Sequence, residues 1–211
     1  MKTSPAFLMV TFATTVLIAG CGERAANDQQ PEGVGSPTTE TPADQPGATA
    51  PTADASVQLS PTQGNTVTGD LRLAGTGTGV RIMGTVTGLT PNGEFGFHVH
   101  ENGDCSAPDA SSAGPHFNPT NSQHGNPAGD AHHAGDMYNI KSDAQGQAQI
   151  DAQLEGVTLA QGQPTDVDRR AIVVHEKPDD YTTQPSGNSG SRIACGVITA
   201  GAGQAVGAGA G

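Results

Sequence analysis

The chain has 211 residues, with nine basic and twenty-one acidic side chains and a formal net charge of −12. Such an acidic chain lacks the basic patch that phosphate binding requires, so we exclude nucleic acid as a partner. Thirty Gly, fifteen Pro and no Trp disfavour a helical bundle. The composition favours short strands joined by many turns, in one domain with appendages.

Residues 1–20 are typical of a bacterial export signal. Lys2 precedes a short apolar run that ends in "LIAGC", with small residues directly before Cys21. This ending resembles a lipobox, in which Cys21 receives lipid once residues 1–20 are removed. The alternatives are an ordinary cleavable signal or an uncleaved helix. The lipoprotein interpretation predicts membrane attachment through an N-terminal lipid, in the bacterial cell envelope and facing the periplasm or the exterior.

Two segments of low complexity flank the predicted folded domain. Residues 21–54 are rich in Pro, Thr, Ala, Gln and Gly and hold almost no large apolar side chain. We expect a lipidated Cys21 followed by a disordered tether, because such a segment buries too little surface to offset its chain entropy. Residues 201–211 form a Gly/Ala tail. The folded domain is therefore predicted over residues 55–200, which is enough for one core.

Alternation of apolar and polar side chains predicts that this domain is all-β. The expected strands lie within residues 66–75, 80–89, 94–101, 146–159, 169–176 and 192–199. Residues 105–136 and 177–191 lack alternation and predict two long functional loops. Short antiparallel strands with two long loops favour a β-sandwich or a flattened barrel.

Seven histidines gather in one part of this pattern. In "FGFHVHENGDC", His98 and His100 alternate with apolar residues, so both point to one face of a strand. The pair alone is compatible with a polar ladder on the surface. The others occupy or adjoin the first long loop and the end of "AIVVH", at His116, His124, His132, His133 and His175. This clustering favours a metal site, in which imidazole suits zinc or copper and Asp136 adds an oxygen ligand.

The chain has three cysteines, an odd number for an exported protein. If Cys21 carries lipid, Cys105 and Cys195 remain as a pair that an oxidising compartment would allow to form a disulfide. The alternative is two buried free thiols.

Six segments together resemble one family, the copper/zinc superoxide dismutases. They are "GFHVHENGDC", "SAGPHFNP", "HGNP", "HAGD", "VVHEKPDD" and "SGSRIACGVI", in the family's order and across nearly the whole domain. The resemblance implies a Greek-key β-sandwich or flattened barrel with an immunoglobulin-like architecture. It also implies copper and zinc as cofactors, superoxide as the substrate and a homodimer among the partners.

The resemblance assigns roles residue by residue. It implies four copper ligands, His98, His100, His116 and His175, and four zinc ligands, His116, His124, His133 and Asp136. His116 is then the catalytic ring that bridges both metals, and Arg192 is the catalytic arginine. Asp179 matches a carboxylate that hydrogen-bonds a ligand of each metal, and Cys105 and Cys195 match the family's disulfide. His132 does not fit the zinc motif, and we expect it to be a solvated loop residue.

These roles together imply an enzyme that converts superoxide to oxygen and hydrogen peroxide at a copper centre supported by zinc. The alternative is a related lipoprotein on the same fold that binds or delivers copper and zinc without catalysis.

Overall fold

The computed structural model describes residues 55–201. The predicted signal, Cys21, the tether and nearly all of the Gly/Ala tail lie outside the described residues. Within them, no helix has the length and apolar character needed to cross a membrane. The elements are β1 (Ala55–Pro61), β2 (Thr68–Gly75), β3 (Gly79–Thr87), β4 (Glu94–Phe95), β5 (Phe97–His100), the short 3-10 helix η1 (Ser111–Ala113), β6 (Ile140–Lys141), β7 (Ala148–Glu155), β8 (Ala171–His175), β9 (Arg192–Val197) and β10 (Thr199–Ala200).

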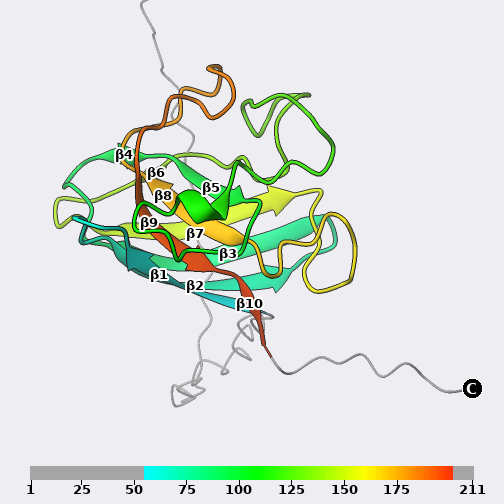
Figure 1. Cartoon of the computed structure of the whole chain (residues 1–211), viewed down its shortest axis with the longest axis horizontal. Helices are drawn as coiled ribbons and strands as arrows, with labels where there is room; N and C mark the ends of the chain where they lie inside the picture. Colours follow the sequence, from blue (N-terminus) through cyan, green and yellow to red (C-terminus); the bar gives the residue numbers. More distant parts are fainter. Residues whose placement is uncertain (1–54, 202–211) are drawn as a thin grey trace, which may run out of the picture. The chain divides into compact units, whose positions relative to one another are not determined.

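One antiparallel sheet of eight strands forms the domain. Its strands follow the order β5-β8-β9-β1-β2-β3-β7, with β10 paired to β1 at the side. The sheet curls so that β1, β2, β3 and β7 face β5, β8 and β9 across a shared core (Figure 1). Both halves contribute fully buried side chains to this core, among them Leu71, Ile82, Phe97 and Ile172. The all-β sandwich predicted from the sequence is confirmed.

Strand β5 has two buried faces of different character. Phe97 and Val99 belong to the main core, as the alternation predicts. His98 and His100 point to the other face, yet they are 0% and 1% exposed. Their cross-strand partners are Val173 and Ala171 on β8, which pack in a second apolar cluster. The two histidines are therefore enclosed, and a polar ladder on the surface is excluded.

The structure differs from the expected strands in three places, one of which is the unexpected short strand β6. Strand β1 was not expected, although Ala55, Val57 and Leu59 alternate with exposed residues. It joins the two halves of the sheet by pairing with β2 on one side and β9 on the other. The expected strand over residues 94–101 is also interrupted at Gly96: β4 pairs with β6, and β5 pairs with β8. Gly96 instead hydrogen-bonds the backbone of Lys177 and His175.

Two long loops lie at the same end of the sandwich. The first loop runs from residue 101 to residue 139 and includes η1, and the second loop runs from residue 176 to residue 191. In Figure 1 they are mainly green and orange, and both lie over the half of the sheet formed by β5, β8 and β9. The disulfide between Cys105 and Cys195 joins the first loop to β9. The alternative of two free thiols is thereby excluded.

We predict that replacing Cys105 and Cys195 by Ser lowers the stability of the domain markedly. The disulfide spans a sequence separation of 90 residues. Opening a loop of that size costs about 4–5 kcal/mol in the chain-entropy model. Denaturant unfolding of the double variant against the oxidised parent measures the difference. An unchanged unfolding midpoint would show that the bond contributes nothing to stability.

Candidate metal centre

Two groups of four side chains form at the junction of the sheet and the loops. The first group comprises His98, His100, His116 and His175, and the second comprises His116, His124, His133 and Asp136. Within each group, every residue offers one ring nitrogen or carboxylate oxygen, and these atoms lie within 4.8 Å of one another. All seven residues are buried. The structure thus brings together the residues that the sequence assigned to copper and to zinc.

Hydrogen bonds fix which nitrogen of each ring in the first group faces its neighbours. His100 Nδ1 donates to the Gly114 carbonyl at 2.8 Å, and His175 Nδ1 donates to the Gly190 carbonyl at 3.2 Å. His98 uses Nε2 to donate to Asp179 at 2.7 Å. Each of these rings donates a hydrogen bond from one nitrogen, which leaves a lone pair on the other nitrogen. The hydrogen bond therefore decides which nitrogen the ring can present to a metal.

The second group is arranged around the carboxylate of Asp136. Its Oδ2 accepts backbone N–H bonds from Gly125 and His133, at 3.1 and 2.8 Å. Its Oδ1 lies 2.8 Å from His116 Nδ1 and 3.3 Å from His133 Nδ1. His124 Nδ1 lies 3.0 Å from Oδ2. Three ring nitrogens and one carboxylate oxygen form the mixed set that zinc favours.

His116 is the ring shared by the two groups. Its Nδ1 faces Asp136, and its Nε2 is buried with no hydrogen-bond partner. The position of His116 follows from backbone pairing, because it forms an isolated bridge with His100. Phe117, the next residue, is anchored in the core. One imidazole can therefore contribute a nitrogen to each group.

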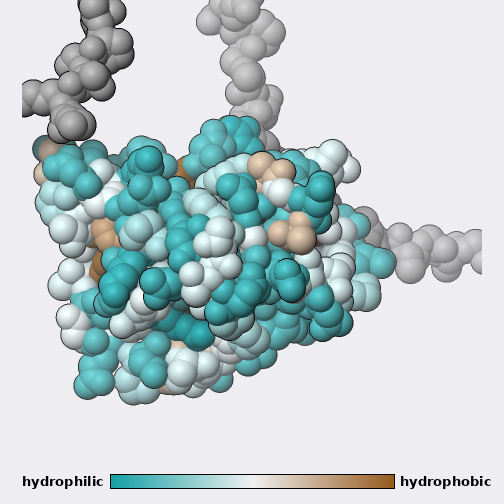
Figure 2. Space-filling model, turned by 90° about the horizontal axis from the view of Figure 1, so that it is seen from above, coloured by the Kyte–Doolittle hydropathy of each residue, from teal (hydrophilic) through white to brown (hydrophobic). Residues whose placement is uncertain are grey.

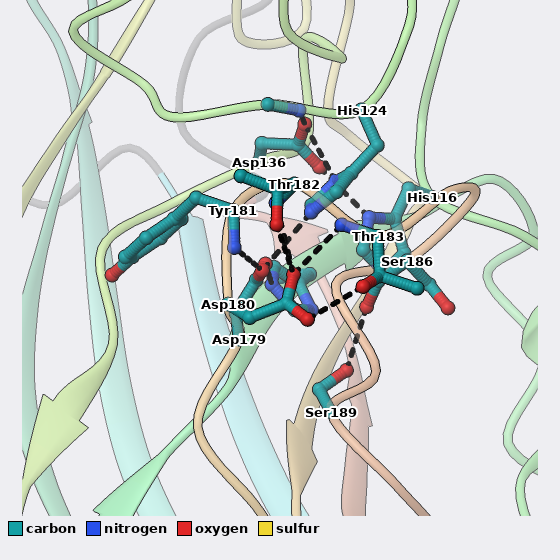
Figure 3. Close-up of polar contacts among 12 residues, drawn as sticks. His116, His124, Asp136, Asp179, Asp180, Tyr181, Thr182, Thr183, Ser186 and Ser189 are labelled. Carbon is teal, nitrogen blue, oxygen red and sulfur yellow. Dashed lines mark hydrogen bonds and ion pairs between the residues drawn. The ribbon is translucent and has the colours of Figure 1, made fainter.

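Asp179 links the two groups from the second loop. Its Oδ2 accepts from His98 and its Oδ1 accepts from His124 Nε2, at 2.7 and 3.0 Å. Figure 3 shows Asp179 and Asp136 on different sides of the His124 ring. Gly187 is required beside this contact, because a Cβ there would lie 1.7 Å from Asp179 Oδ1. The carboxylate thus orients one histidine in each group.

Two side-chain amides that the sequence analysis did not identify connect the loops. Asn139 exchanges two hydrogen bonds with the backbone of Asp179, at 2.8 and 2.9 Å. Gln184 likewise accepts from the His124 N–H at 3.0 Å and donates to its carbonyl at 2.8 Å. An isolated Asn or Gln in a loop carries no distinctive sequence pattern. These contacts could be found only from the folded chain.

Three rings of the first group, His100, His116 and His175, are neutral at neutral pH. Burial lowers the pKa of His116 to about 4 and that of His175 to about 3, and it lowers the pKa of His100 well below its usual value. His124 differs, because its carboxylate partners outweigh the lowering by burial and raise its pKa to about 9. The two carboxylates of this region therefore favour a positive charge between them.

The donor atoms of the two groups are arranged as ligands of bound cations would be. His100 Nε2 and His175 Nε2 lie 3.3 Å apart, and both carry lone pairs because their Nδ1 atoms donate elsewhere. Four further buried ring nitrogens make no hydrogen bond: His98 Nδ1, His116 Nε2, His124 Nδ1 and His133 Nδ1. The last two lie 3.0 and 3.3 Å from Asp136 oxygens, outside hydrogen-bond geometry. Facing lone pairs and unpaired buried nitrogens are costly unless a cation satisfies them. An all-imidazole set suits copper, and the set with Asp136 suits zinc.

Arg192 lies beside the first group because of an irregularity in the sheet. A register shift after Val174 places Arg192 opposite His175 on the neighbouring strand. Its guanidinium donates to the carbonyls of Ala110 and Gly114, both at 2.5 Å. Gly114 also accepts from His100. The first loop thus holds the arginine and one histidine through the same carbonyl.

A pocket of about 560 Å³ opens over this arrangement. Arg192 lines it together with His100, His116, His133 and His175. Figure 2 shows the loop-bearing side of the domain, on which hydrophilic residues cover most of the surface and hydrophobic ones form small separate patches. His132 does not line the pocket; it is half-buried, and its Nδ1 hydrogen-bonds the His133 carbonyl.

Comparison with known proteins agrees with this geometry. The family model for copper/zinc superoxide dismutase (SODC) matches residues 67–198. Superoxide dismutase [Cu-Zn] 2 of Aquifex aeolicus is 43% identical over 149 residues, which span 68% of this chain and 85% of the relative. The superoxide dismutase-like protein YojM of Bacillus subtilis is 42% identical over 125 residues, 57% of this chain and 63% of the relative.

Solved structures give the same result. The crystal structure of a superoxide dismutase-like protein from Bacillus subtilis superposes with a TM-score of 0.61 and 39% identity. The match covers 67% of this chain and 96% of that one. The fold, the clustered histidines and these relatives agree. The chain therefore belongs to the copper/zinc superoxide dismutase family, a family of oxidoreductases whose cofactors are copper and zinc.

Proposed function

We propose that this protein catalyses the dismutation of superoxide, in which one superoxide loses an electron and leaves as oxygen. A second superoxide gains that electron and two protons and leaves as hydrogen peroxide. The observation that carries the proposal is the sharing of His116 between two complete four-ligand groups. A binding or delivery protein has no need for a ring common to both groups beside an arginine-lined pocket.

We assign the first group to copper and the second to zinc. Bound copper would supply reversible one-electron oxidation and reduction, and bound zinc would supply a fixed positive charge without redox chemistry. Asp179 orients His98 and His124 by accepting their Nε2 protons. The loops enclose the second group, of which His124 and Asp136 do not line the pocket.

The chain's own residues bind the substrate and supply a proton to it. The Arg192 guanidinium retains its charge although burial lowers its pKa. It can donate hydrogen bonds to a small anion in the pocket. His116 lines the same pocket, and its Nε2 can hold a proton and donate it to the reduced substrate. A local positive charge is needed because the whole chain carries −12.

We also propose that the protein is a lipoprotein of the bacterial cell envelope, anchored through Cys21. This rests on the signal pattern and the "LIAGC" ending. The described cysteines, Cys105 and Cys195, are paired with each other. That pairing supports an oxidising compartment.

The metal assignment predicts different losses from different histidines. His175→Ala should lose copper and dismutase activity but retain zinc, because His175 belongs to the first group alone. His133→Ala should lose zinc and lower the melting temperature, since a metal bound only to the folded state stabilises it. Elemental analysis of reconstituted protein checks both. His132→Ala is the matched control, and equal damage from it would refute the assignment of His133.

The role of Arg192 predicts a rate effect without metal loss. Arg192→Ala should slow superoxide consumption about fivefold or more with copper and zinc retained, and Arg192→Glu should slow it further, because the anion loses its attraction to the pocket. The rate of the parent protein should fall as salt rises, since the Debye length is only about 10 Å at 0.1 M. Stopped-flow kinetics on metal-quantified samples measure both effects. A metal-replete Arg192→Glu protein at full speed would exclude the role.

The lipid anchor predicts the mass and partitioning of the mature chain. The membrane-extracted protein should begin at a lipidated Cys21 and partition into detergent, because acyl chains favour an apolar phase. The Cys21→Ser variant should instead remain in the aqueous phase. Intact mass spectrometry decides the matter, and an unmodified N-terminus downstream of Cys21 would contradict the anchor.

A further inference from the structure

The pocket over the first group contains a negative charge as well as Arg192. Besides histidines, the charged residues that line it are Arg192 and Glu101. Glu101 directly follows His100, and its side chain is 40% exposed. A free carboxylate at this place would oppose the approach of an anion and offset the charge of Arg192.

Glu101 cannot easily move away from the pocket. Its backbone N–H donates to the Pro115 carbonyl at 2.9 Å, next to the bridge between His100 and His116. The backbone that positions one histidine therefore also positions this acid. Its charge must be balanced locally if the pocket is to attract anions.

Arg170 supplies that balance from outside the pocket lining. Its Nη1 donates to Glu101 Oε1 at 2.6 Å and to the Glu101 carbonyl at 2.5 Å. The first contact holds the carboxylate, and the second holds the Glu101 backbone, close to Arg170, which directly precedes β8. No other ion pair to Glu101 occurs among residues 55–201.

Arg170 is itself held in place by two further contacts. Its guanidinium lies 4.2 Å from the ring centroid of Phe117, which is fully buried. Its Nε donates to the Asp166 carbonyl at 3.2 Å. Exposed ion pairs are usually weak because both partners are free to move. A guanidinium stacked on a fixed ring and bonded to carbonyls keeps its geometry.

We propose that Arg170 is a positioning residue that holds Glu101 and neutralises its charge. The positive charge of Arg192 is then not offset within the pocket and attracts a small monovalent anion. Arg170 does not touch the substrate; it acts through Glu101. The inference rests on the proposed function for its substrate, superoxide. The affinity of the pocket for anions, which the inference concerns, can be measured without superoxide.

A charge-exchange experiment on the copper- and zinc-loaded protein tests this role. Arg170→Gln leaves Glu101 unbalanced and should lower kcat/KM for superoxide about threefold, the size expected for one charge in a solvated pocket. Glu101→Gln leaves Arg170 unbalanced and should raise kcat/KM by a similar factor. The double variant should return close to the parent value. Arg170→Lys keeps the charge and should remain near the parent if it folds.

A second readout uses azide, a small anion that ligates copper, titrated by absorbance. Its affinity should follow the same order: weaker in Arg170→Gln, stronger in Glu101→Gln and restored in the double variant. The matched control is Arg81→Gln, which breaks an ion pair with Asp151 between β3 and β7, away from the pocket lining. It makes the same change in net charge and should alter neither readout.

The outcomes are distinct. If the pair were merely structural, Arg170→Gln, Glu101→Gln and the double variant would all be slower and would have lower melting temperatures. Glu101→Gln would then not raise the rate, and that result would overturn the inference. An equal effect of Arg81→Gln would also overturn it, because net charge alone would then govern binding. A metal-loaded parent that binds azide but does not consume superoxide would refute the proposed function, while the azide series would still decide the role of Arg170.

Discussion

The carboxylate of Asp179 is the contact on which the arrangement of both groups depends. It accepts one proton from His98 on β5 and one from His124 in the first loop. Each bond leaves the opposite nitrogen of the ring facing its own group. The pKa of Asp179 is lowered because hydrogen bonds from His124 and His98 outweigh the effect of burial. The acid therefore stays ionised, and one buried charge orients ligands that belong to two different groups.

The loops can hold this geometry because the sheet and the disulfide support them. Strand β5 presents its two histidines opposite the small residues Ala171 and Val173 of β8, and His175 at the end of β8 joins them in the first group. The first loop closes over that face and is tied to β9 by Cys105 and Cys195. Small apolar residues around the disulfide form their own cluster. Rigid support of this kind keeps ligand atoms within the narrow distances that a metal requires.

Charge is organised on two scales in this protein. The chain as a whole is acidic, which would repel an anion at long range. At the pocket, Arg192 lines the cavity, and Arg170, which lies outside the lining, binds Glu101, the one acid that lines it. Both arginines are anchored by backbone carbonyls. Two anchored arginines thus lie at or beside the pocket of an otherwise acidic chain.

The sequence by itself determined the all-β fold class and indicated a metal site, because strand periodicity and residue type are local properties. The resemblance to the family assigned the individual ligands and matched Cys105 with Cys195. The two-residue spacing was enough to place His98 and His100 on one face, and the chemistry of imidazole was enough to indicate metals. Only the tertiary structure decided that β1 joins the two halves of the sheet, that Gly96 divides the predicted strand, and which nitrogen each ring presents. It also revealed the contacts of Asn139, Gln184 and Arg170. Asn139, Gln184 and Arg170 act on residues 40, 60 and 69 positions away, and no local pattern encodes a hydrogen bond that forms only after the chain has folded.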